Sequence, residues 1–131
     1  MSLFIYMICK MLVSSDESGI YSLYEVDIKT AKKTRLTDFE DSTYAVAYFP
    51  KDERVLFTKD SGGNERYHIY VRETDGTVKD LTPGEETRAG FAGFTEDGKH
   101  FFITSNQRDA KFMDLYRVDA NSYEVTPVYQ N

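Results

Sequence analysis

Hydrophobic positions along this chain form short runs, separated by polar and turn-forming residues. The runs are rich in Val, Ile, Phe, Tyr and Thr, which favour strands over helices. Residues 67–73 show it most clearly, because Tyr67, Ile69 and Val71 alternate with the other residues of that segment. No window sustains the apolar stripe and capping residues of an amphipathic helix. The pattern therefore predicts an all-β chain.

The pattern also recurs along the chain. Residues 49–59 read FPKDERVLFTK and residues 94–105 read FTEDGKHFFITS. Other landmarks recur with the same period of 45 to 46 residues: Leu36-Thr37 and Leu81-Thr82, and then Leu23-Tyr24, Ile69-Tyr70 and Leu115-Tyr116. Separate landmarks that keep one period indicate a chain built from repeats.

Each repeat contains four strand-like runs. In the clearest copy, the runs are separated by a turn at residues 50–53, a Gly-containing loop at 60–66 and the Asp75-Gly76 pair, which favours a tight turn. A four-stranded unit at this period is typical of a β-propeller blade. We therefore predict a single partial β-propeller over residues 1–131, made of about three four-stranded antiparallel blades.

The blades are expected at about residues 3–37, 44–83 and 90–127, and the first is expected to be incomplete. Its last three strands are recognisable at residues 10–15, 21–28 and 32–37. The apolar residues before them contain none of the turn residues that should follow a first strand. We therefore expect the chain to start inside a blade, or its first blade to be rebuilt.

Composition excludes several classes of function. The chain has 16 basic and 22 acidic residues, and its net charge of −6 provides no electrostatic footprint for nucleic acid. The single cysteine, Cys9, cannot form an internal disulfide, and zinc-ligand spacings are absent. Two histidines and the lack of a calcium-loop spacing lead us to expect neither a metal nor a cofactor.

The apolar run at residues 3–8 does not have the features of a signal peptide. It lacks a basic start and a small-residue cleavage site, and it is too short to span a bilayer. We expect no membrane partner. The compartment stays open, with the cytoplasm favoured because no signal peptide is recognisable.

Several loops and strand ends resemble a known family. The segments are DSGGNER at 60–66, DLTPG at 80–84, TSNQRD at 104–109 and FMDLYRVD at 112–119. They resemble the N-terminal propeller of the prolyl oligopeptidase family of serine peptidases (peptidase family S9), in its acylaminoacyl-peptidase and dipeptidyl-peptidase-like branch from bacteria. The likeness extends from about residue 12 to residue 129, although TolB-type propellers share the blade pattern.

The resemblance implies a role without catalysis in this chain. In that family a propeller covers an α/β-hydrolase domain that carries the catalytic triad, and this chain has no such domain. The implied function is to gate access to the catalytic domain and to position peptide there. The alternative is a TolB-like or WD40-like propeller module for protein–protein interaction. An autonomous small hydrolase is a third reading.

Residues for independent catalysis are not evident in the sequence. No Gly-x-Ser-x-Gly segment exists to form a nucleophile elbow, and the Ser-Gly pairs lie in predicted turns. His68 and His100 fall at strand positions, where a sheet histidine is expected rather than a member of a triad. The predicted set of catalytic residues is therefore empty.

Loops are the expected place for contacts. Strands in a blade alternate in direction, so the loops between second and third strands lie on one face with the connections between blades. That face is weighted toward acidic residues, for which a solvated rim is the favoured explanation and a docking or substrate-gating surface the alternative. The candidate contact residues are Glu65, Arg66, Arg108 and Asp109, chosen by position and by family likeness.

An open arc of blades also predicts self-association. Closed propellers leave only short, protected edges, whereas a three-blade arc exposes the flanks of its terminal blades. Large apolar patches of this kind mark interfaces or aggregation hazards. We expect a second copy of this chain to cover the flanks. The expected partners in a full-length parent are the peptide substrate or the hydrolase domain.

Overall fold

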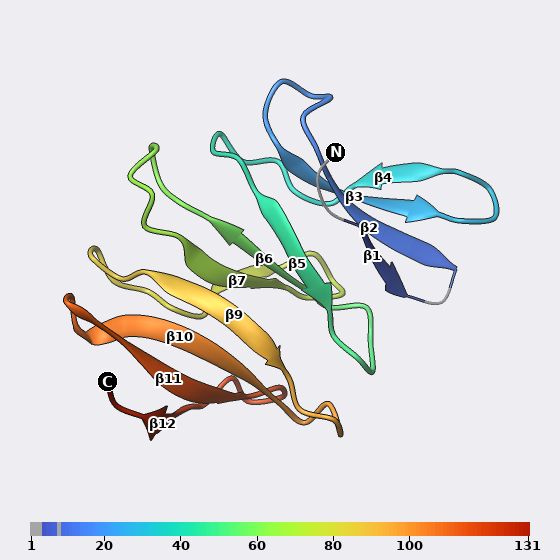
Figure 1. Ribbon diagram of the computed structural model, residues 1–131. Helices are drawn as coiled ribbons and strands as arrows, with labels where there is room; N and C mark the ends of the chain where they lie inside the picture. Colours follow the sequence, from blue (N-terminus) through green and yellow to red (C-terminus); the bar gives the residue numbers. More distant parts are fainter. Residues whose placement is uncertain (1–3, 8) are drawn as a thin grey trace.

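The computed structural model describes residues 4–7 and 9–131, which form twelve strands and contain no helix (Figure 1). The first sheet contains β1 (Phe4–Met7), β2 (Lys10–Ser15), β3 (Ser22–Asp27) and β4 (Lys33–Arg35). The second contains β5 (Tyr44–Tyr48), β6 (Val55–Lys59), β7 (His68–Arg72) and β8 (Val78–Asp80). The third contains β9 (Ala89–Phe94), β10 (His100–Asp109), β11 (Phe112–Asp119) and β12 (Val125–Tyr129). The all-β prediction is confirmed.

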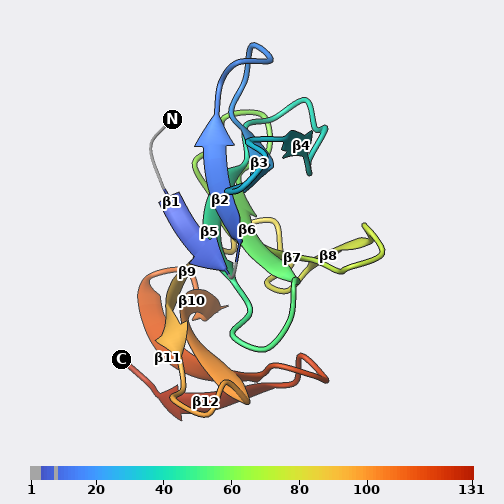
Figure 2. The same ribbon diagram turned by 90° about the vertical axis from the view of Figure 1, so that its right-hand side faces the viewer.

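Each sheet is a meander, in which every strand pairs antiparallel with its neighbour in sequence. The three sheets follow one another in chain order, and β1, β5 and β9 lie together on one side while β4 and β8 lie on the other (Figure 2). No helix that could cross a membrane is found in the described part of the chain.

The first sheet differs from the prediction of an incomplete blade, because β1 supplies a fourth strand. Met7 pairs with Lys10, so a very tight turn joins β1 to β2. Cys9 occupies this turn with a φ of 65°, in the left-handed region that glycine usually fills. The sequence lacks glycine there, which is why the turn signal was missing.

Two hydrophobic cores fill the spaces between consecutive sheets. The core between the first and second sheets contains Leu12, Leu23, Ala45, Tyr48, Val55 and Phe57. The core between the second and third contains Phe49, Leu56, Ile69, Val71, Leu81, Phe101, Ile103, Tyr116, Val118 and Ala120. In the second sheet, alternation along the strands sends neighbouring residues to opposite cores: Val55 and Phe57 to one, Leu56 to the other.

A threonine hydroxyl explains the repeated Leu-Thr pairs. The Thr37 Oγ1 accepts a hydrogen bond from the backbone N–H of Leu23, and the Thr82 Oγ1 accepts one from Ile69, both at 2.9 Å. All four residues are buried. Each threonine therefore satisfies a backbone donor at the third strand of its sheet, which would otherwise be costly to bury.

Arg54 ties the second sheet to the third. Its guanidinium carbon lies 3.9 Å from the centre of the Phe49 ring, and it forms a salt bridge of 2.9 Å with Asp52. The same group donates hydrogen bonds to the carbonyl of Ala120 and to the hydroxyl of Tyr123, both in the turn that joins β11 to β12 of the third sheet. This contact joins residues that lie more than 60 positions apart.

Candidate functional site

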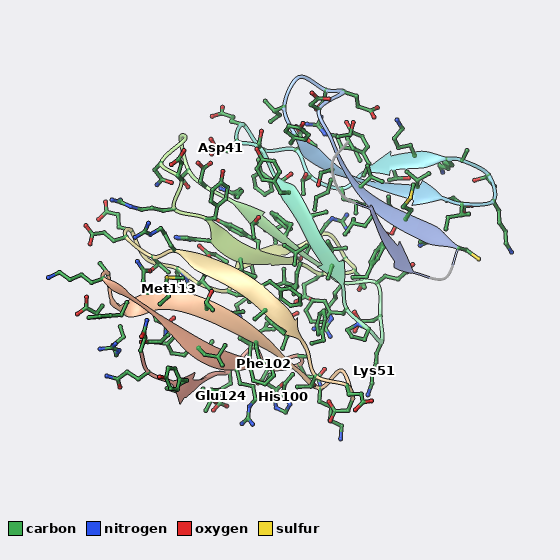
Figure 3. All side chains as sticks on the ribbon, viewed as in Figure 1. Asp41, Lys51, His100, Phe102, Met113 and Glu124 are labelled. Atoms are coloured by element: carbon green, nitrogen blue, oxygen red, sulfur yellow. The ribbon has the colours of Figure 1, made fainter. Side chains whose placement is uncertain are left out.

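The loops gather at two opposite ends of the sheets. Figure 3 places Asp41, before β5, and Lys51, after β5, at opposite ends of the second sheet. We call the end with the β6–β7 loop the loop face. There the Asp41 Oδ1 accepts a hydrogen bond of 3.1 Å from the N–H of Gly62, so the connection between the first two sheets contacts the β6–β7 loop. The expected grouping of these loops is therefore seen.

Side-chain to backbone hydrogen bonds order the β6–β7 loop. The Asn64 Oδ1 accepts from the backbone N–H of Arg66 at 2.9 Å, and the Asp60 Oδ2 accepts from that of Glu65 at the same distance. Glu65 has a φ of 59°, in the left-handed region. Asn and Asp side chains commonly stabilise turns in this way. The loop therefore has a defined conformation although it is exposed.

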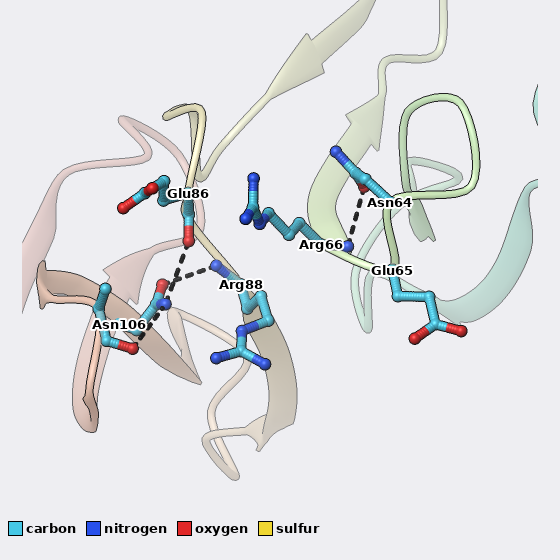
Figure 4. Close-up of a pocket in the computed structure, with 7 residues that line it drawn as sticks. Asn64, Glu65, Arg66, Glu86, Arg88 and Asn106 are labelled. Atoms are coloured by element: carbon cyan, nitrogen blue, oxygen red, sulfur yellow. Dashed lines mark hydrogen bonds between the residues drawn. The ribbon is translucent and has the colours of Figure 1, made fainter.

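Asn106 anchors the connection between the second and third sheets. Its side chain is buried and accepts a hydrogen bond of 2.6 Å from the backbone N–H of Arg88. Its amide nitrogen donates to the carbonyls of Glu86, at 3.1 Å, and Ala110, at 3.4 Å. One buried amide thus joins the β8–β9 connection to the β10–β11 loop (Figure 4).

These segments enclose an open polar hollow of about 410 Å³. It is lined by Asn64, Glu65, Arg66, Glu86, Arg88, Asn106 and Ala110. The Arg66 guanidinium also donates a hydrogen bond of 3.3 Å to the carbonyl of Glu85, which brings the β6–β7 loop against the β8–β9 connection. We call this cavity the loop-face hollow.

The structure separates the four predicted contact residues. Glu65 and Arg66 line the loop-face hollow. Arg108 instead forms a salt bridge of 2.7 Å with Asp114, whose side chain is buried, and it does not line the hollow. Asp109 caps its own turn by accepting a hydrogen bond from the N–H of Lys111. Their role as contact residues stays a prediction.

The prediction omitted Arg88 and Asn106. Arg88 precedes β9, so it lies on a connection between sheets and belongs to the same face as the β6–β7 loop. This position in the sequence was enough to assign Arg88 to the loop face. Asn106 had no such signal, because its role depends on hydrogen bonds to residues 18 to 20 positions earlier in the chain.

Both histidines form in-sheet contacts with aspartates. The His68 Nδ1 lies 2.8 Å from the Asp80 Oδ2, and the His100 Nε2 lies 3.8 Å from the Asp119 Oδ2. Within residues 4–7 and 9–131, no serine hydroxyl is hydrogen-bonded to either imidazole. The same residues contain no cluster of three or more His, Cys, Asp or Glu side chains placed to hold a metal.

Comparison with curated proteins identifies a relative. The chain is 37% identical over 93 residues to dipeptidyl aminopeptidase BIII of Pseudoxanthomonas mexicana. The chain is related to the propeller region of the S9 serine peptidases. The match covers 68% of this chain but 13% of the relative, so the chain spans a small part of the relative's length. No family model matches the sequence.

Solved structures share the fold. Porphyromonas gingivalis dipeptidyl peptidase 4 has a TM-score of 0.76 at 11% identity, over 98% of this chain and 18% of that one. TolB from Acinetobacter baumannii has a TM-score of 0.66 at 24% identity, over 95% and 31%. A puromycin-hydrolyzing peptidase of Mycobacterium tuberculosis has 0.72 at 16%, over 98% and 20%. The partial-propeller prediction is confirmed, and the chain resembles the propellers of both S9 peptidases and TolB.

Proposed function

We propose that this chain is a non-catalytic propeller segment that gates access to, and positions peptide at, a hydrolase domain outside the chain. The observation that carries the proposal is the 37% identity to a segment of dipeptidyl aminopeptidase BIII. The loop face is the surface that would contact peptide, because its loops carry exposed charged groups on a rigid sheet scaffold. The described histidines have in-sheet aspartate partners, which fits a segment without a triad.

A chimera tests this function. The segment of dipeptidyl aminopeptidase BIII that aligns with this chain is replaced by the chain, and hydrolysis of a dipeptidyl chromogenic substrate is compared with that of longer peptides. We expect the chimera to fold and to hydrolyse the short substrate. Replacing loop 60–66 of the chimera by a Gly-Ser linker of equal length should change kcat/KM for long peptides more than for the short substrate.

The matched control replaces the turn at residues 50–53, at the opposite end of the second sheet, in the same way. This change should leave the ratio between long and short substrates unaltered. Gating by the loop face is refuted if both replacements have equal effects on that ratio. Hydrolysis by the isolated chain would support the autonomous hydrolase instead.

The alternative function is a propeller module for protein–protein interaction. The observation in its favour is the likeness to TolB, which extends over 95% of the chain. A chimera that folds but responds to no loop change in its peptide kinetics would favour this alternative.

Self-association is a second proposal, in which a second copy of this chain covers the open flanks. Exposed apolar side chains near the end of the third sheet support it, among them Val128 at 50% and Tyr129 at 66% exposure. Ile28, directly after β3 of the first sheet, is 52% exposed. In a ring-like pair, the first sheet of each copy would lie against the third sheet of the other.

A further inference from the structure

The loop-face hollow is lined by two arginines whose guanidinium groups have no carboxylate partner. Among the described residues, Arg35, Arg54 and Arg108 each form a salt bridge, whereas neither Arg66 nor Arg88 has a carboxylate oxygen within 4 Å. Both line the hollow. In Figure 4 the two guanidinium groups lie on different sides of the hollow, so two unpaired positive charges border it on a chain of net charge −6.

The acidic residues of the lining do not neutralise this site. Figure 4 shows the Glu65 carboxylate pointing away from both guanidinium groups, and the Glu86 side chain pointing to the far side of its own segment. The remaining polar groups of the lining are the amides of Asn64 and Asn106.

The Arg66 side chain and the Arg88 backbone are held by their surroundings. The Arg66 side chain donates to the Glu85 carbonyl, and its backbone N–H is fixed by Asn64. The backbone of Arg88 is fixed on both sides, because its N–H donates to the Asn106 Oδ1 and its carbonyl accepts from the Asn106 N–H at 3.2 Å. Such pre-organisation lowers the entropic cost of binding.

We propose that Arg66 and Arg88 bind the carboxylate of an acidic residue in a peptide, bridging the second and third sheets. A guanidinium matches a carboxylate with two parallel N–H donors. The hollow, at about 410 Å³ and open to solvent, has room for a side chain and its flanking backbone. This inference rests on the proposed function, since it names the peptide group that the loop face would take.

The test is an NMR titration of the full chain with N-acetyl-aspartate amide, with N-acetyl-asparagine amide as the neutral analogue. We expect shifts at residues 64–66, 88 and 106 with the aspartate compound only. R66Q and R88Q should each weaken binding by about fivefold, the upper range for an exposed ion pair. R117Q, an exposed arginine of β11 outside the hollow, is the control and should bind normally.

Three results would overturn the inference. They are equal shifts with both compounds, unchanged binding in R66Q and R88Q, and shifts confined to other parts of the chain. Inorganic phosphate is titrated as a second anion. If phosphate binds more tightly than the aspartate compound and depends on both arginines, the site is a phosphate site and the peptide assignment fails.

The two proposals fail separately. Binding to the isolated chain requires no catalytic domain, so specific carboxylate binding would stand even if the chimera showed no gating. A chimera that gates peptides while the isolated chain ignores the aspartate compound would overturn the carboxylate site alone. Each variant is first checked by its NMR spectrum, so that a loss of folding is not counted as a loss of binding.

Discussion

The second and third sheets have the same strand pattern, but one flank of the second is covered and its counterpart on the third is open. Leu56 pairs with Val71 on the covered flank, and the positions 46 residues later, Phe102 and Arg117, pair in the same register. Leu56 and Val71 are fully buried against the third sheet. Phe102 is half-buried and Arg117 is exposed, because none of the described sheets packs against this side of the third sheet.

The open flank carries charge where the covered flank is apolar. Arg117 stands at the position equivalent to Val71. It lines a small polar hollow of about 120 Å³ together with His100, Asp119, Glu124 and Thr126. In Figure 3, His100, Phe102 and Glu124 lie together on the side of the third sheet away from the second. Charged residues on an exposed sheet limit uncontrolled pairing. The flank therefore combines an apolar centre at Phe102 with a charged surround.

The largest expected difference is between two equivalent core positions. Leu56→Ala should lower the free energy of unfolding by about 2–5 kcal/mol, because it leaves a cavity in a fully packed core. Phe102→Ala, at the equivalent position of the open flank, should cost clearly less. Urea denaturation of both variants, at a concentration low enough for the chain to be monomeric, measures the difference, and equal losses would contradict the description of the third sheet's flank as open.

Arg54 and His100 give the next comparison, since they occupy equivalent positions 46 residues apart. Arg54→Gln removes hydrogen bonds to Ala120 and Tyr123, and should cost about 1.5–3 kcal/mol because the donor is charged and partly buried. His100→Gln should change the free energy of unfolding little, because the one polar partner of the His100 side chain among the described residues is Asp119 of its own sheet, at 3.8 Å. Thermal or urea unfolding compares the two, and an inert Arg54 would refute the inter-sheet tie.

The repeated Leu-Thr pair has no counterpart in the third sheet, where Val128-Tyr129 stands instead. Thr82→Val keeps the shape of the side chain but leaves the buried N–H of Ile69 unpaired, so we expect a loss of about 1–2 kcal/mol. Thr37→Val should have a similar cost through Leu23. Thr126→Val, at an exposed position, serves as the control for the same denaturation measurement.

The smallest expected effect depends on pH. The Arg108 guanidinium, followed by the backbone N–H of Asn131, lowers the pKa of Asp114. The pKa of Asp114 is therefore lower in the folded chain than the value of about 3.9 expected in the unfolded chain. Ionised Asp114 stabilises the fold above about pH 4, and this stabilisation is lost as the pH falls through the lowered pKa of the folded chain. Arg108→Gln should raise the pKa of Asp114 in an NMR titration, whereas Arg117→Gln should not.

Sequence alone predicted the parts of this molecule that depend on local pattern. The strands of the second and third sheets follow from alternation and from turn residues such as Asp75-Gly76, where Gly76 has a φ of 91°. The turn at Cys9 could not be predicted, because a residue other than glycine adopts the left-handed conformation there.

The candidate site was only partly predictable for a different reason. Arg66 could be assigned to the loop face from chain topology, and it lines the hollow. Arg108 had the same signals in sequence but pairs with Asp114, a contact that depends on the conformation of the β10–β11 loop. Asn106 was missed because its partners belong to a distant connection.

The most direct test of whether the open flank of the third sheet binds a second copy is the solution mass of the chain, measured by light scattering during size exclusion. If the open flank of the third sheet is an interface for a second copy, the mass should be twice the 15.1 kDa of one chain. Phe102→Glu should then return it to 15.1 kDa, while Lys51→Glu, in the exposed turn after β5 and away from this flank, should leave the dimer intact. A wild-type mass of 15.1 kDa at all concentrations would contradict the account, because the flank would then be stable in water without a partner.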